Sequence, residues 1–215
     1  MPEFKVLATP DDVARTAADE IVAALAAGSR TLVLAGGNTP KRCYELLAQK
    51  SGIAWGRVTV LFGDERCVPP DDPESNFRMA REALLDQVSP ASVHRIAGEL
   101  GPDEAAKAYD SLVGGLAPLD LVLLGVGEDG HTASLFPGHP ELQAKGWAVA
   151  VRNSPKPPPD RVSLTLDALR GARRVIVLAA GAGKSDAVAK ARRGEVPSGM
   201  IAGAQWLIDK AAAGQ

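Results

Sequence analysis

The alternation of short apolar runs with helical patterns is the feature that most constrains how this chain folds. In runs such as "VTVLFGDE" (58–65) and "LDLVLLGVG" (119–127), successive residues are apolar instead of every second one. This pattern is typical of strands in a sheet that helices cover on both faces. We predict strands over 31–37, 58–65, 119–127, 147–152, 161–166 and 174–180.

The segments between these runs carry the signals of helices. Thr9 is a predicted N-cap, Pro10 follows at the first helical position, and Gly28 ends the same segment. Thr39 and Pro40 repeat this opening after the first predicted strand. We predict helices over 9–28, 39–50, 76–87, 103–114, 184–193 and 203–213.

This alternation predicts an α/β fold with a three-layer, mostly parallel, Rossmann-like sheet and helices on both of its faces. Such sheets bind their ligands at the carboxyl ends of the strands. No internal repeat divides the sequence, and its one biased stretch, "SPKPPPD" (154–160), is too short to link two domains. We therefore expect a single domain over residues 1–215.

Composition and charge exclude several classes of function. The formal net charge of −2, with 23% charged residues, gives no overall basic field for nucleic acid. No apolar stretch approaches the roughly 18 residues of a membrane span, and the first residues lack a signal-peptide pattern. Cys43 and Cys67 form no C-x-x-C motif, which suits a reducing compartment. We expect a cytoplasmic protein that binds neither membranes nor nucleic acid.

Two glycine-rich stretches resemble nucleotide-binding motifs but depart from them. Residues 125–130 read "GVGEDG", yet Pro137 and Pro140 interrupt the helix that a dinucleotide fingerprint requires. The acidic residue expected about 20 positions further on is also missing. "GAGKSD" (181–186) has Leu178 where a P-loop needs its first glycine. We therefore expect no nucleotide cofactor.

Two turns at predicted strand ends are nevertheless candidate anion sites. Gly36 and Gly37 let the backbone approach a ligand, and Asn38 tolerates unusual dihedral angles. Thr39 and Pro40 then start a helix whose unpaired N–H groups attract anions. Lys184 stands at a similar glycine-rich helix start and could hold a phosphate. The alternative for each is a plain turn, with the lysine in solvent.

Charged residues follow two other predicted strands. Asp64, Glu65 and Arg66 come directly after the run at 58–65, where they form either part of a site or a surface charge cluster. His131 stands two residues after Asp129 in the glycine-rich loop. A histidine in this setting is a candidate general base near neutral pH, or a loop histidine that only caps a backbone group.

Other chemistries can be excluded more firmly. The sequence has no G-x-S-x-G elbow, so Ser134 is a poor candidate for a triad nucleophile. It has no H-E-x-x-H motif, and His94, His131 and His139 lack the spacing of metal ligands. We therefore expect no metal, and a hydrolysis would have to use water activated by a side chain.

Five segments, taken in order, resemble the 6-phosphogluconolactonase family: "LAGGNTP", "FGDERCVPPDDPESNFRMARE", "LDLVLLGVGEDGHTASLFPG", "NSPKPPPDRVSLTL" and "AAGAGK". The resemblance runs through nearly the whole chain. It implies a fold related to glucosamine-6-phosphate deaminases and ribose-5-phosphate isomerases. The implied reaction is hydrolysis of a small sugar-phosphate lactone, 6-phospho-D-glucono-1,5-lactone, in the oxidative pentose phosphate pathway, with neither metal nor cofactor. We expect a monomer or a weak homo-oligomer.

The resemblance also implies roles for individual residues. His131 is expected to take a proton from the attacking water, and Asp129 to orient its imidazole or place the substrate hydroxyls. Binding of the substrate and its phosphate is expected from Gly36, Gly37, Asn38, Thr39, Asp64, Arg66, Lys156, Arg161 and Lys184.

Two alternatives remain at this point, a deaminase or isomerase on the same fold and a non-catalytic sugar-phosphate binding protein. The deaminases are similar in the D-G-H loop but carry a glutamate five positions after the histidine. Phe136 stands at that position here, and a phenylalanine cannot move protons. The presence of both Asp129 and His131 disfavours a protein without catalytic activity.

Overall fold

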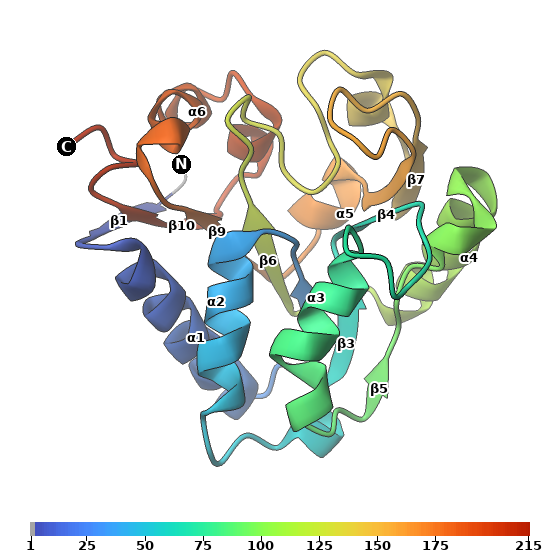
Figure 1. Cartoon of the computed structure of the whole chain (residues 1–215), viewed down its shortest axis with the longest axis horizontal. Helices are drawn as coiled ribbons and strands as arrows, with labels where there is room; N and C mark the ends of the chain where they lie inside the picture. Colours follow the sequence, from blue (N-terminus) through green and yellow to red (C-terminus); the bar gives the residue numbers. More distant parts are fainter. Residues whose placement is uncertain (1–2) are drawn as a thin grey trace.

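The computed structural model describes residues 3–215, which form two sheets surrounded by helices (Figure 1). The larger sheet has seven strands, all parallel, in the order β1-β10-β9-β6-β2-β3-β5. The smaller sheet is antiparallel, in the order β4-β8-β7. The strands are β1 (Glu3–Leu7), β2 (Thr31–Leu34), β3 (Thr59–Phe62), β4 (Asp64–Arg66), β5 (Ser92–Val93), β6 (Leu121–Gly125), β7 (Ala148–Val151), β8 (Arg161–Leu164), β9 (Arg174–Ala179) and β10 (Gln205–Asp209).

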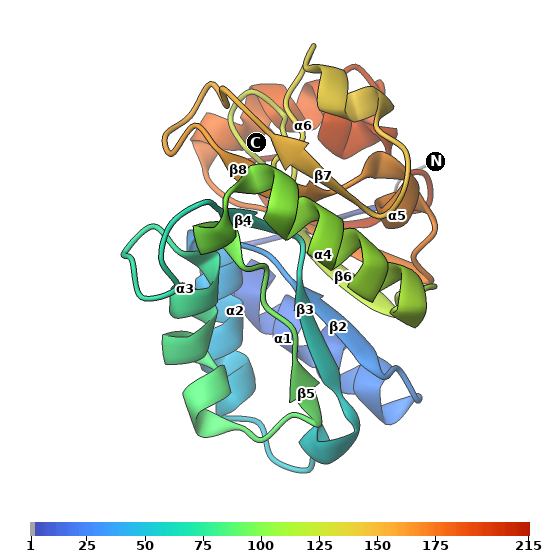
Figure 2. The ribbon, with the colours of Figure 1, turned by 90° about the vertical axis from the view of Figure 1, so that its right-hand side faces the viewer.

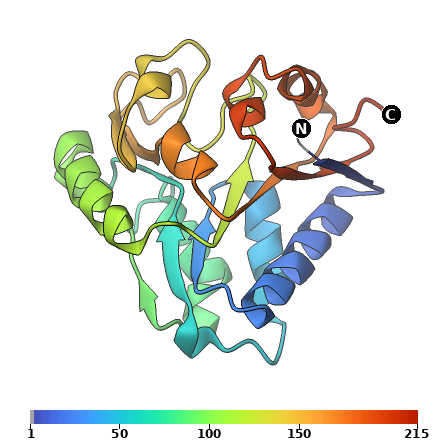
Figure 3. The same cartoon turned by 180° about the vertical axis from the view of Figure 1, so that it is seen from behind.

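The helices lie on both sides of the larger sheet, as predicted. They are α1 (Pro10–Ala26), α2 (Asn38–Ala48), α3 (Asn76–Ala83), α4 (Pro102–Leu116), α5 (Leu166–Arg170) and α6 (Ser185–Arg192). Helices α2 and α3 lie in front of the sheet in Figure 1, whereas α4 and α5 lie on the side that Figure 3 brings forward. Figure 2 shows α4 running beside the smaller sheet, where it contacts β7. Within residues 3–215, no helix has the length and apolar character needed to cross a bilayer.

Local sequence signals account for the central elements. Every residue of β2 is buried, as are Leu121–Leu124 of β6, because helices cover both faces of the sheet. Helix α1 begins at the predicted N-cap: the Thr9 side chain accepts a hydrogen bond from the Asp12 N–H, and the Asp12 carboxylate accepts one from the Thr9 N–H. Gly28 ends this segment at a φ of 111°.

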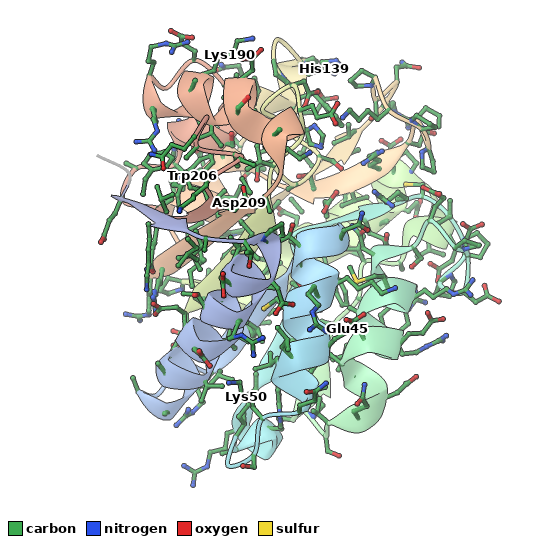
Figure 4. All side chains as sticks on the ribbon, turned by 60° about the vertical axis from the view of Figure 1, so that its left-hand side comes forward. Glu45, Lys50, His139, Lys190, Trp206 and Asp209 are labelled. Atoms are coloured by element: carbon green, nitrogen blue, oxygen red, sulfur yellow. The ribbon has the colours of Figure 1, made fainter. Side chains whose placement is uncertain are left out.

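The helix predicted over 203–213 is wrong. Residues Gln205–Asp209 form β10, which pairs with both β1 and β9, and its Trp206 is fully buried (Figure 4). The alanines after this run suggested a helix, but they form a turn in which the Ala212 N–H donates to the Asp209 carboxylate. Burial of the successive apolar residues in the sheet outweighs the helix propensity of the alanines. Strands β1 and β5 and the short helix α5 were not predicted.

Two predicted strand segments, and the end of a third, belong to a different sheet from the one expected. The run at 58–65 is broken at Gly63, after which β4 leaves the larger sheet. The segments at 147–152 and 161–166 become β7 and β8, which pair antiparallel with each other and, through β8, with β4. Gly63 joins the sheets, since its N–H donates to the Leu34 carbonyl and its carbonyl accepts from the Leu164 N–H.

Two buried tyrosines fix the ends of β2 and β3 from opposite sides. The Tyr44 hydroxyl, on α2, accepts a hydrogen bond from the Ala35 N–H at 2.7 Å and donates to the Ala35 carbonyl at 2.9 Å. The Tyr109 hydroxyl, on α4, makes the same pair of bonds with Phe62, both at 2.8 Å. Each hydroxyl therefore satisfies backbone groups at a point where a strand passes into a loop.

We expect Tyr44→Phe to lower the free energy of unfolding by about 1–3 kcal/mol, because it leaves buried backbone groups of Ala35 unpaired. Urea denaturation followed by circular dichroism measures this change. Ser111→Ala is the matched control, since it removes an exposed hydroxyl that bonds only within its own helix, and it should change the free energy by less than about 0.5 kcal/mol. Equal effects of the two substitutions would contradict the role of Tyr44.

Candidate active site

A cavity of about 400 Å³ lies at the carboxyl ends of β2, β6 and β9. The order of the sheet reverses between β2 and β6, which is where α/β sheets bind ligands. The structure brings to this cavity all but one of the residues predicted for the site. Its walls include Gly36, Gly37, Asn38, Thr39, Asp64, Arg66, His131, Lys156, Arg161 and Lys184. The exception is Asp129, which contacts His131 but does not line the cavity.

Asp129 and His131 form a close pair. The His131 Nδ1 lies 2.5 Å from the Asp129 Oδ1, which also accepts a hydrogen bond from the His131 N–H at 3.2 Å. When Asp129 is ionised, this contact places the proton of a neutral imidazole on Nδ1 and leaves the lone pair on Nε2. The arrangement is that of a general base oriented by a carboxylate.

The glycines of the loop after β6 allow this pair to form. A Cβ atom at Gly127 would lie 2.0 Å from the His131 Nδ1 and 2.5 Å from the Asp129 Oδ1, so only glycine fits there. Gly130 turns the chain at a φ of 85°, and a Cβ there would meet Val196 at 2.6 Å. The loop is closed by a hydrogen bond from the Gly127 N–H to the His131 carbonyl at 2.9 Å.

The surroundings set the charges of the pair. Burial lowers the pKa of His131 below its ordinary value of 6.5, against the opposite influence of Asp129 and Asp64. Burial would raise the pKa of Asp129, but His131 and Lys156 together keep it below its usual value. At neutral pH the pair is therefore a neutral imidazole beside a carboxylate, the state that a general base requires.

The predicted anion site at Gly36–Thr39 is built from the end of β2 and the start of α2. The helix begins at Asn38, with Gly37 as its N-cap at a φ of 107°, and not with the N-cap at Thr39 that the Thr-Pro pair suggested. A Cβ at Gly36 would come within 2.1 Å of the Asn76 side chain, so glycine is required for that approach. The first N–H groups of a helix have no partner within it, and here the residues that start α2 line the cavity.

Asp64 is buried in the cavity wall, and both of its carboxylate oxygens accept hydrogen bonds. The Ser134 hydroxyl donates to Oδ2 at 2.6 Å. The Asn76 side-chain amide donates to Oδ1 at 3.2 Å and to the Asp64 backbone carbonyl at 3.0 Å. From the sequence we rejected Ser134 as a nucleophile, and we considered Asn76 as a helix cap or ligand contact without including it in the predicted site. Both partners lie far from Asp64 in the sequence, so no local signal links them, although Asn76 at the start of a predicted helix was a weak indication.

Arg161 is only 3% exposed, and most of its N–H groups donate hydrogen bonds to carbonyls of the preceding loop. Its Nε donates to the Pro158 carbonyl at 3.0 Å, and its Nη2 donates to the carbonyls of Lys156 and Pro157 at 3.1 and 3.0 Å. Arg161 thereby holds the proline-rich loop that carries Lys156, a residue of the cavity wall. Contact between Arg161 and a phosphate stays a prediction.

Glu65 holds the segment that carries Arg66. Its buried carboxylate accepts hydrogen bonds from the N–H groups of Arg66, Asn76 and Phe77 at 2.7–2.8 Å and from the Ser75 hydroxyl at 3.0 Å. Burial raises the pKa of Glu65, and the three N–H donors partly offset that effect. Glu65 therefore accepts hydrogen bonds from N–H groups at the start of α3 that have no partner within the helix. It also fixes the backbone of Arg66, a residue of the cavity wall.

We expect Asp129→Asn to lower the pKa of His131 further, because it removes a negative charge that favours the imidazolium. Nuclear magnetic resonance titration of the histidine Cε1–H signals measures this pKa, and a His131→Gln variant assigns the signal. In the unsubstituted protein the pKa should lie below 6.5. A His131 pKa that stays the same or rises in Asp129→Asn would contradict the contact between the two side chains.

Comparison with known proteins identifies the family of the chain. A sequence model of the family described as glucosamine-6-phosphate isomerases/6-phosphogluconolactonase matches residues 8–208. The 6-phosphogluconolactonase of Streptomyces coelicolor is 41% identical, over 87% of this chain and 82% of the relative. That of Mycobacterium tuberculosis is 43% identical, over 90% of this chain and 88% of the relative.

Solved structures share the whole fold. The 6-phosphogluconolactonase of Trypanosoma brucei matches with a TM-score of 0.90 at 29% identity, over 100% of this chain and 98% of that one. A monomeric glucosamine-6-phosphate deaminase matches with a TM-score of 0.86 at 22% identity, over 99% of each chain, which shows a common fold alone. The family match over most of the chain and relatives above 40% identity lead to one conclusion: the chain belongs to the glucosamine-6-phosphate isomerase/6-phosphogluconolactonase family.

Proposed function

We propose that this chain is an enzyme that hydrolyses 6-phospho-D-glucono-1,5-lactone to 6-phospho-D-gluconate, the second step of the oxidative pentose phosphate pathway. The observation that carries the proposal is the His131–Asp129 pair, a neutral base in a cavity that is also lined by four cationic side chains. The relatives above 40% identity, which bear the name of this activity, support the same substrate.

In the proposed reaction His131 acts through Nε2 as the general base. It takes a proton from a water molecule whose oxygen attacks C1 of the lactone, and C1 becomes tetrahedral. The bond between C1 and the ring oxygen then breaks, and the imidazolium returns its proton to that oxygen, which becomes a hydroxyl group. Asp129 stabilises the imidazolium between these two steps. Positioned acid–base catalysis of this kind accelerates a reaction on the order of 10²–10⁴-fold.

The phosphate group of the substrate is a dianion, and the cavity is suited to it. Arg66, Lys156 and Lys184 line the cavity from three separate parts of the chain, and the N–H groups at the start of α2 are further candidate donors. Arg161 adds positive charge from the cavity wall. We assign Asp64 to the sugar, because its fixed carboxylate is placed to accept hydrogen bonds from hydroxyl groups.

The environment of residue 136 argues against deamination or isomerisation on this fold. Phe136 is fully buried and stands where the deaminases carry their proton-transferring glutamate. No acid is therefore available at this position to open a sugar ring. Water activation by His131 is the chemistry that the remaining groups favour.

The proposal includes a single catalytic domain that works in the cytoplasm as a monomer or a weak homo-oligomer. Both cysteines are free thiols, and Cys43 is buried, which supports a reducing compartment.

One comparison of substrates tests the function. The purified chain should consume 6-phosphogluconolactone far faster than the uncatalysed reaction and should leave glucosamine 6-phosphate unchanged. Acid release at constant pH measures the first reaction, and ammonia release measures the second. Ammonia release without lactone consumption would replace the lactonase proposal with a deaminase.

We expect His131→Gln to reduce turnover of the lactone by about 10²-fold or more, because it removes the general base. Binding of 6-phosphogluconate, measured by calorimetry, should persist because the cations of the cavity remain. His94→Gln is the matched control, since His94 lies outside the cavity, and it should keep full activity. Turnover of His131→Gln close to that of the unsubstituted chain would remove His131 from the role of base.

A further inference from the structure

Phe136 is a fully buried core residue, yet among residues 3–215 it lies outside the main contiguous cluster of buried side chains. Its exposed fraction is 0%, but the cluster of buried residues that joins the two sheets includes Leu135 and not Phe136. It is also absent from the cavity walls, so it is not placed to touch a substrate. The role of Phe136 therefore depends on the groups that its ring contacts.

The ring contacts polar and charged groups of the site. The His131 imidazole lies against it, with a centroid distance of 4.5 Å and an angle of 38° between the planes. The Arg161 guanidinium carbon lies 5.7 Å from the ring centroid. His139, labelled in Figure 4, lies with its ring centroid 5.7 Å away. Phe136 therefore lies between the proposed base and the arginine that holds the Lys156 loop.

We propose that Phe136 is a positioning residue for the reaction, whose ring fixes the orientation of the His131 imidazole so that Nε2 faces the attacking water. This inference rests on the proposed function of His131. Phe136 touches no reacting atom and acts only through the histidine.

The need for such a residue follows from the other contacts of the imidazole. Asp129 holds Nδ1, but a single hydrogen bond at one edge of a ring leaves the ring free to tilt about that edge. The backbone at Gly127 blocks part of this motion, because no side chain separates it from the imidazole. The face of Phe136 restricts the tilt that remains and excludes water from that side of the ring.

Several charged groups surround the imidazole and bear on its protonation. Asp129 and Asp64 favour the imidazolium, whereas Lys156 and burial disfavour it. Arg161 lies against Phe136, and His139 beyond it has Glu141 at 3.7 Å. Replacing the ring with a smaller or more flexible side chain would admit water beside the imidazole while leaving each of these charges in the chain. The pKa of His131 should then rise toward its ordinary value.

Phe136→Leu and Phe136→Met test the proposal, because both keep an apolar side chain and remove the flat ring. Phe4→Leu is the matched control. The Phe4 ring also stacks on an aromatic ring, with 4.9 Å between its centroid and that of Trp206. The guanidinium carbon of Arg192 lies 4.0 Å from the Phe4 centroid. Phe4 lies on β1 and does not line the cavity. Thermal melts of all three variants establish that each is folded before the kinetics are compared.

In the Phe136 variants we expect kcat for the lactone to fall on the order of 10–100-fold, as for a misplaced catalytic group. KM should change by less than about threefold, because Phe136 does not line the cavity. The acid limb of the kcat/KM profile should move to higher pH together with the His131 pKa measured by resonance titration. Phe4→Leu should change none of these quantities.

Two results would overturn the inference. An unchanged kcat and His131 pKa in folded Phe136 variants would show that the ring does not position the imidazole. A raised KM with unchanged kcat and His131 pKa would show that Phe136 acts through Arg161 and the Lys156 loop instead. The titration requires no substrate, so it tests the contact of Phe136 with His131 even if the unsubstituted chain failed to hydrolyse the lactone.

Discussion

The parallel pairing of β2 with β6 is the interaction on which the rest of the structure depends. Leu32 and Val33 pair with Leu121 and Val122, and the sheet extends from this pair to β3 and β5 on one side and to β9, β10 and β1 on the other. Because all these strands run in the same direction, their carboxyl ends lie at one edge. Loops from four parts of the chain therefore meet around one cavity.

Most charged groups around that cavity are partly or wholly buried. Backbone N–H and carbonyl groups form the hydrogen bonds that water would otherwise provide. Burying a charge is unfavourable unless hydrogen bonds replace its hydration. Glu65 receives the N–H groups at the start of α3, and Arg161 donates to the carbonyls of a loop. Each bond that satisfies a buried charge also fixes a loop. The cavity is thereby shaped before any substrate arrives, which reduces the entropy lost on binding.

The sequence predicted the fold class and most residues of the cavity because the signals concerned are local. Runs of successive apolar residues predict buried strands, and glycines next to charged residues mark the loops that follow them. The strand β10 was mistaken for a helix because its alanine-rich continuation has high helix propensity. The separate antiparallel sheet could not be predicted, since it includes the pairing of β8 with β4, which is distant in the sequence.

By itself the sequence determined which chemical groups stand at the strand ends: a histidine two residues after Asp129, a pair of glycines before a helix, and cations in the loops. Only the tertiary structure decided how those groups are used. It directs the donors of Arg161 to backbone carbonyls, gives Asp64 its partners Ser134 and Asn76, and places Phe136 against His131. The physical reason is that the partners of Asp64 come from other parts of the chain, and that the contacts of Arg161 and Phe136, although short in sequence, depend on how the loops fold once the sheet has formed.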